Sequence, residues 1–161
     1  MSWLSQIFTR KPVTVPNLWD GKVLTNVEFQ TMLGAWEPMA DQTYAVIKAD
    51  ALPDYYRWFR ETLRTLGILR WDEKFDCDNF ARMYADLMAA RFYGSLWEGG
   101  SVPKAESPAV AVFWYRPNCG PAGHAIVRVS TDKGLIAIEP QTGAIMPLTE
   151  NEIASRYRTI A

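Results

Sequence analysis

Two runs of alternating residues, separated by only a few positions, constrain the fold of this chain most. The first extends from His124 to Ser130 and the second from Leu135 to Glu139. Runs this close together predict an antiparallel hairpin. Because successive side chains of a strand point to opposite faces, the length of the hairpin loop decides which residues share a face.

An even loop, of two or four residues, gives the simpler pattern. It pairs Ser130 with Leu135 and leaves one face of the hairpin wholly apolar. His124 and Glu139 then become diagonal neighbours at one end of the other face, within reach of a long side chain. A three-residue loop with a bulge at Gly134 would put Glu139 on the opposite face and mix polar with apolar residues. The cleaner separation favours the even loop.

Two helices are predicted before the hairpin. Asp50 is a candidate N-cap with Pro53 in the first turn, and apolar residues recur at helical spacing as far as Gly67, a natural stop. The second helix is expected to begin at about Cys77 and to be buried on most sides, because it carries few charges. Its alanines form a small-residue face suited to close packing. A loop is expected over 94–108.

Two further strands and a short terminal helix complete the pattern. The strands are predicted at 43–48 and 109–115, which are rich in residues that favour strands. Thr149 and Glu152 have the spacing of a capping box, which opens a helix. Helices followed by consecutive antiparallel strands indicate an α+β fold, with the helix that begins at Cys77 packed on a small antiparallel sheet.

Length and composition predict a single domain. A chain of 161 residues, 48% of them hydrophobic, can bury a substantial core, and one domain over 1–161 is expected. Its first segment, 1–40, is rich in proline and glycine and is expected to form loops with one short helix near 27–33. The apolar part of residues 1–12 is too short for a signal peptide, and no run reaches transmembrane length.

Charge and cysteine content narrow the function classes. The formal net charge is −1 and no block of Lys or Arg stands out, so nucleic acid is not an expected partner. Two cysteines cannot form a disulfide framework, which fits a reducing environment. A cytoplasmic or a phage and host-cell context agrees with these features.

Cys77, His124 and Glu139 are the candidate catalytic residues. Cys77 would lie at a helix start, where unpaired N–H groups and the helix dipole favour the nucleophilic thiolate. His124, the single histidine of the chain, would take the thiol proton and return it to the leaving group, and Glu139 would orient the imidazole ring. These residue types in this order predict a thiol hydrolase that cleaves a peptide or amide bond.

The oxyanion donors and the nucleophile have rival candidates. The backbone N–H of Cys77 is one oxyanion donor, and the second is Gln141 or Gln42. Cys119 lies in a loop of glycine and proline shortly before His124 and is the rival nucleophile, without a helix start. Taken singly, a cysteine at a helix start is more often a small buried hydrophobic residue than a nucleophile.

Two carboxylates, those of Asp76 and Asp78, flank Cys77 and oppose a thiolate between them. Either Asp76 is the N-cap of the helix or a bound cation neutralises the pair. Asp78, Asn79, Glu139 and Gln141 offer the hard oxygen atoms that calcium prefers. A calcium site beside the nucleophile is therefore the alternative to capping by Asp76.

Three segments of the chain resemble a known family. They are Asp-Cys-Asp-Asn-Phe-Ala at 76–81, His-Ala at 124–125 and Ile-Glu-Pro-Gln-Thr-Gly at 138–143. They are similar to the papain-like cysteine protease domain at the C-terminus of Marasmius-type mushroom agglutinins, and to related bacterial and phage proteins. The resemblance spans roughly residues 70–145. It implies a papain-like fold, a triad of Cys77, His124 and Glu139, and calcium dependence, with Asp78 and Gln141 as the metal ligands.

Two other functions fit the same residues. Bacterial cell-wall endopeptidases and amidases carry their nucleophile in Asp-Cys-Ser-Gly at a similar helix start, where this chain has Asp78 and Asn79 in place of Ser-Gly. The second of these functions is that of a binding module, formed by a papain-like domain without catalytic activity. The enzyme hypotheses imply a peptide or protein substrate, or a peptidoglycan peptide, as the partner.

Overall fold

A seven-stranded mixed sheet lies at the centre of the computed structural model, which describes residues 17–34, 39–97 and 102–161. The strands are β1 (Trp19–Thr25), β2 (Thr43–Ile47), β3 (Ser107–Pro108), β4 (Val110–Tyr115), β5 (His124–Thr131), β6 (Gly134–Ile138) and β7 (Arg158–Ile160). Their order is β1-β2-β5-β4-β7, with β3 paired to β2 and β6 paired to β5.

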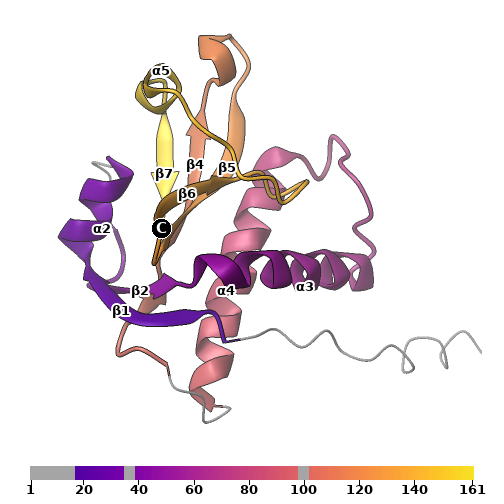
Figure 1. The fold of residues 1–161 in the computed structure, drawn as a ribbon. Helices are drawn as coiled ribbons and strands as arrows, with labels where there is room; N and C mark the ends of the chain where they lie inside the picture. The colour runs from indigo at the N-terminus through magenta and orange to yellow at the C-terminus, as the bar shows by residue number, and fades with distance from the viewer. Residues whose placement is uncertain (1–16, 35–38, 98–101) are drawn as a thin grey trace, which may run out of the picture.

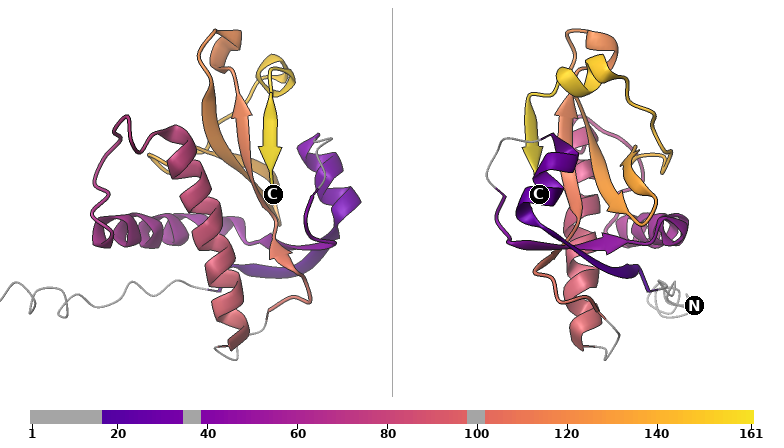
Figure 2. Two further views of the ribbon diagram at one scale, coloured as in Figure 1. Left: turned by 180° about the vertical axis from the view of Figure 1, so that it is seen from behind. Right: turned by 60° about the vertical axis from the view of Figure 1, so that its left-hand side comes forward.

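Two long helices pack beside this sheet. They are α3 (Leu52–Thr65) and α4 (Cys77–Trp97). The described residues also form two shorter helices, α2 (Asn26–Leu33) and α5 (Glu150–Ala154), and short 3₁₀ turns at Ala49–Ala51 and Pro117–Cys119. Figure 1 shows α3 crossing α4 steeply, with α4 alongside β4 and β5. The view from behind shows α4 passing the sheet along most of its length (Figure 2).

The predicted fold class, a papain-like α+β domain with a helix on a small antiparallel sheet, is wrong. The sheet is mixed, because β2 pairs in parallel with β3 and β5, whereas β4 pairs antiparallel with β5 and β7. Strands β1, β3 and β7 are not predicted from the sequence. Strands of two and three residues, such as β3 and β7, are too short to show alternation. The segment of β1 contains Asp20 and Gly21, which disfavour strands.

Most predicted elements are confirmed close to their expected bounds. The strands expected at 43–48 and 109–115 are β2 and β4, and the helix expected near 27–33 is α2. The capping box of Thr149 and Glu152 is present at the start of α5. Residues 1–12 lie outside the described residues, and the single domain over the whole chain stays a prediction.

Two helix boundaries differ from the prediction. Asp50 does not cap α3, because the 3₁₀ turn at Ala49–Ala51 leads directly into the helix and Asp50 pairs with Lys133 instead. The helix that begins at Cys77 continues through Gly94 to Trp97, and Ser107–Pro108 form β3, so the loop expected over 94–108 is wrong at both ends. A single glycine lowers helix stability by about 1 kcal/mol, which the packing of a long helix can offset.

Each face of the sheet is covered. On one face, Phe59 of α3 and Tyr84 of α4 are fully buried, with their rings 5.1 Å apart in an edge-on arrangement. On the opposite face, Phe113 and Ile126 form a smaller cluster with Met146 packed against it. The main core therefore fixes α3 and α4 against the sheet, and the segment after β6 closes the other side.

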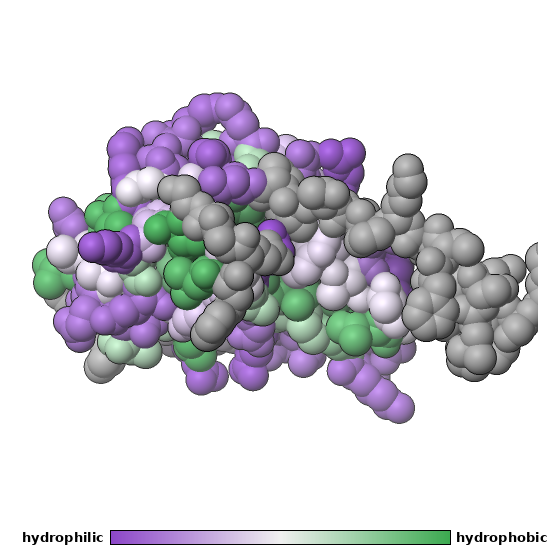
Figure 3. Space-filling model, turned by 90° about the horizontal axis from the view of Figure 1, so that it is seen from below, coloured by the Kyte–Doolittle hydropathy of each residue, from purple (hydrophilic) through white to green (hydrophobic). Residues whose placement is uncertain are grey.

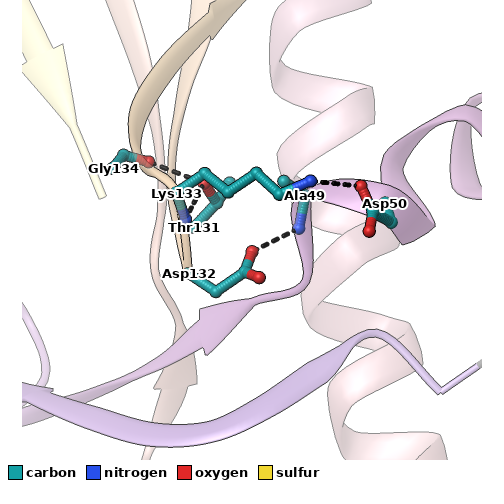
Figure 4. A network of polar contacts seen from close by, with 6 residues as sticks. All are labelled: Ala49, Asp50, Thr131, Asp132, Lys133 and Gly134. Atoms are coloured by element: carbon teal, nitrogen blue, oxygen red, sulfur yellow. Dashed lines mark hydrogen bonds and ion pairs between the residues drawn. The ribbon is translucent and has the colours of Figure 1, made fainter.

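The hairpin of β5 and β6 has the predicted even loop. Ser130 pairs with Leu135 and Thr131 with Gly134, which leaves a two-residue loop. Two polar contacts connect the loop to the turn before α3 (Figure 4). The Asp132 carboxylate accepts a hydrogen bond from the Ala49 backbone N–H at 2.7 Å, and the Lys133 ammonium pairs with Asp50. The register of the hairpin is thus tied to a second part of the chain.

The turn after β6 is held by α3. The Tyr56 hydroxyl donates to the Gln141 carbonyl at 2.8 Å, and the Arg60 guanidinium donates to the same oxygen at 3.3 Å. Gly143 in this turn has φ +76°, and a Cβ there would lie 2.6 Å from the Tyr56 ring. A glycine is therefore required at this position both by the backbone conformation and by the close approach of the ring.

We expect Gly143→Ala to destabilise the protein more than Gly67→Ala. Gly67 also has a positive φ (+81°) but no atom within 4 Å of its Cβ position, so its substitution costs only the backbone strain, about 1 kcal/mol. Gly143→Ala adds overpacking against Tyr56, about 1–3 kcal/mol more. Urea denaturation measures both. Equal losses of unfolding free energy would contradict the packing of the turn on α3.

Candidate functional site

The structure brings Cys77, His124 and Glu139 together where α4 begins, β5 begins and β6 ends. His124 Nε2 lies 2.6 Å from Glu139 Oε2. The Cys77 thiol lies close enough to the same imidazole ring to raise its pKa. The His124 and Glu139 side chains keep 22% and 15% of their surface exposed, so solutes can reach them. We call these three residues the polar cluster; their catalytic role stays a prediction.

The environment of His124 favours its charged form. The hydrogen bond with Cys77, followed by that with Glu139, raises the pKa of His124 from 6.5 to about 9, against the opposing effect of burial. The Tyr115 ring lies edge-on at 5.9 Å between ring centroids and limits the orientations of the imidazole. The cluster therefore presents an imidazolium at neutral pH.

Glu139 is positioned by the turn that follows it. Its Oε1 accepts a hydrogen bond from the Gln141 backbone N–H at 3.1 Å, while its other oxygen meets His124. Its own carbonyl accepts from the Gly143 backbone N–H at 2.7 Å. Because Tyr56 of α3 holds Gln141, the carboxylate is fixed from both ends of the turn.

The start of α4 uses Asp76 as a capping residue. Its backbone carbonyl accepts from the Phe80 N–H at 3.0 Å. A hydrogen bond from Asp78 lowers the pKa of Asp76, and hydrogen bonds from the backbone N–H groups of Asn79 and Asp78 add to this effect. The same contact with Asp76 raises the pKa of Asp78. These contacts agree with the N-cap alternative for Asp76.

The predicted calcium ligands are engaged with protein groups. The Asp78 carboxylate pairs with Arg82 at 3.4 Å, one helical turn further along α4. The backbone carbonyl of Gln141 accepts from Tyr56. Within the part of the chain that the structure describes, no group of three or more His, Cys, Asp or Glu residues is placed to hold a metal ion. Calcium binding by Asp78 and Gln141 stays a prediction.

The other candidates from the sequence lie apart from the cluster. Cys119 is exposed in the 3₁₀ turn after β4, with φ 55°. Gln42 precedes β2, where its backbone N–H donates to the Glu106 carboxylate at 2.6 Å. Sequence reasoning missed Tyr56 and Arg60 as supports of the cluster, because spacing marks them only as helix positions and their partner is more than 80 residues away.

The described helices include none that is long and apolar enough to cross a membrane. Seen from below, hydrophobic residues form several separate areas between hydrophilic ones (Figure 3). Isolated apolar areas of this kind are normal on protein surfaces.

Solved structures share this fold. One is described as "PSL1a-E64 complex", with a TM-score of 0.59 and 17% identity over 86% of this chain and 50% of that chain. Another is Polyporus squamosus lectin bound to the human-type influenza-binding epitope Neu5Acα2-6Galβ1-4GlcNAc, with a TM-score of 0.61 and 18% identity over 86% of this chain and 49% of that chain. This chain thus spans about half the length of each. No family model and no curated protein matches the chain.

These comparisons correct the predicted family and function. The second of these structures is of a lectin bound to a glycan epitope, and no family model or curated protein supports the papain-like cysteine protease family. The predicted hydrolase activity, as a thiol protease or as a peptidoglycan endopeptidase, is therefore corrected as well. The physical reason is that a cysteine, a histidine and a glutamate in hydrogen-bond contact form a polar cluster whether or not they turn over a substrate. The alternative of a non-catalytic binding module fits the comparisons better.

We expect Glu139→Gln to lower the pKa of His124 from about 9 toward its ordinary value of 6.5, because the variant loses the charge that stabilises the imidazolium. Titration of the imidazole carbon protons by NMR measures this. Glu150→Gln is the matched control, since exposed Glu150 in α5 carries the same charge.

The same pKa shift predicts how stability depends on pH. Because the pKa of His124 is raised in the folded state, its stabilising contribution is fully present below pH 6.5 and is lost as the pH rises through about 9. Glu139→Gln should flatten that part of the stability profile in urea denaturation. An unchanged His124 titration in this variant would contradict the 2.6 Å contact.

Calcium is expected to raise the melting temperature of the protein if Asp78 and Gln141 bind it, since a ligand of the folded state stabilises that state. Asp78→Asn should remove the response, and Asp54→Asn, on the exposed side of α3, should keep it. Titration calorimetry with millimolar calcium provides the second measurement. Absence of heat and of a thermal shift would exclude the site.

Proposed function

We propose that the chain is a ligand-binding module and that its ligand is a hydroxyl-rich molecule of the carbohydrate class, bound at the polar cluster. The observation that carries the proposal is the joining of Cys77, His124 and Glu139 into one hydrogen-bonded, partly exposed group. The likeness to a lectin whose structure holds a glycan supports the ligand class. A carbohydrate takes the place of the peptide substrates expected from the sequence.

The donors and acceptors of the cluster suit hydroxyl groups. A hydroxyl both donates and accepts, so it can bridge a carboxylate and an imidazolium.

The charge of the region favours a neutral ligand. Glu139 pairs with the imidazolium, and two more carboxylates, Asp76 and Asp78, flank Cys77, so a ligand carboxylate would meet net repulsion. A neutral sugar avoids this repulsion and keeps its hydroxyl hydrogen bonds. Among the sugars of the lectin ligand, Galβ1-4GlcNAc should therefore bind more tightly than the form that carries Neu5Ac.

Titration calorimetry with Galβ1-4GlcNAc and with its Neu5Acα2-6 form tests the proposal. We expect the neutral sugar to bind and Glu139→Gln to weaken it about tenfold, the value of one charge-assisted hydrogen bond. Glu150→Gln should bind as the wild type does. Cys77→Ala should retain most of the affinity, because the thiol contributes only a weak hydrogen bond.

Two results would overturn the binding-module proposal. The first is the absence of heat with both sugars at millimolar concentration. The second is turnover: hydrolysis of a denatured protein substrate that Cys77→Ala abolishes, together with covalent addition of E64 to Cys77 in mass spectrometry. The first result would exclude the proposed ligand, and the second would assign the cluster a catalytic function.

A further inference from the structure

A cavity of about 300 Å³ lies between α4 and the sheet, further along the helix than the polar cluster. Residues Arg82 and Ala89 of α4, Val112 and Trp114 of β4 and Arg158 of β7 are among those that line it. Ile160 of β7 also lines it and is 43% exposed, so the cavity is open to solvent at the β7 edge. Its size is that of a small-molecule site.

The alanine face of α4 creates this space. Close packing was expected for that face, but Ala85 and Ala89 line the cavity instead, opposite Val110 and Val112 of β4. Short side chains on both walls leave a gap that neither element fills. Most of the residues that line the cavity are apolar, so its interior suits a hydrocarbon or aromatic body.

Two guanidinium groups stand at the polar side of the cavity. Arg82 lies 5.5 Å and Arg158 5.2 Å from the ring centre of Trp114. Both contacts are within the range of cation–π attraction to this ring. Arg82 has Asp78 as a partner at 3.4 Å, whereas no carboxylate of the described residues lies within ion-pair distance of Arg158.

We infer that this cavity is a second binding site, for a ligand that joins one carboxylate to an apolar body. The carboxylate would pair with Arg158, whose planar guanidinium can offer two parallel N–H donors. The apolar body would lie against Val110, Val112 and the α4 alanines. Asp86 also lines the cavity and repels an anion, which orients the acid toward Arg158. The inference does not depend on the proposed carbohydrate site.

Decanoate is the probe, and decanol is its uncharged match. We expect titration calorimetry on the whole chain to give at least about tenfold tighter binding of decanoate than of decanol, as one charge-assisted contact implies. Arg158→Gln should reduce decanoate affinity to that of decanol. Arg57→Gln, which removes an exposed arginine of α3, is the charge-matched control and should leave the affinity unchanged.

A second variant tests the cavity itself. Ala89→Leu places a larger side chain in it and should abolish binding of both probes while the melting temperature shows that the variant is folded. Equal affinity for decanoate and decanol, or unchanged binding in Arg158→Gln, would overturn the inference. If Ala89→Leu does not fold, the Arg158→Gln and Arg57→Gln pair still decides it.

Discussion

The register of the β5–β6 hairpin is the constraint on which the polar cluster depends. Ser130 pairs with Leu135, and this pairing sets His124 and Glu139 on one face at a distance of 2.6 Å. A slip of one residue would send the Glu139 carboxylate to the opposite face. Contacts outside the hairpin also oppose such a slip, because Asp132 and Lys133 of the loop bind the turn before α3.

A register brings two side chains near each other, but it does not fix their orientation. Orientation comes from α3, whose Tyr56 hydroxyl holds the Gln141 carbonyl and whose ring leaves room only for glycine at 143. The third member, Cys77, depends on neither contact, since the start of α4 is set by the Asp76 cap and by burial of Phe80. The cluster therefore rests on three separately stabilised elements, so loss of one support should displace one side chain at a time.

The sequence could predict what is local. The hairpin register, the start of α4 and the capping box of α5 follow from residue types a few positions apart. The mixed sheet could not be predicted, because β3 and β7 are strands only through their neighbours. The support by Tyr56 crosses more than 80 residues of chain, and the alanine face gave no sign that it borders a cavity. Residue types at the cluster suggested a peptidase, but function depends on which states the site stabilises, and residue order does not determine that.

Helix α4 links the polar cluster to the cavity through one contact. Asp78 beside Cys77 pairs with Arg82, which stands over Trp114 at the polar side of the cavity. An acid paired with Arg158 would also attract Arg82, which contacts the same Trp114 ring, and would weaken the Asp78–Arg82 pair. The pair is partly exposed, at 50% and 32% of the two side chains. Pairs of this kind contribute at most about 1 kcal/mol. That bound keeps any coupling below about a fivefold change in affinity, and the two sites act as nearly independent binding sites on one helix.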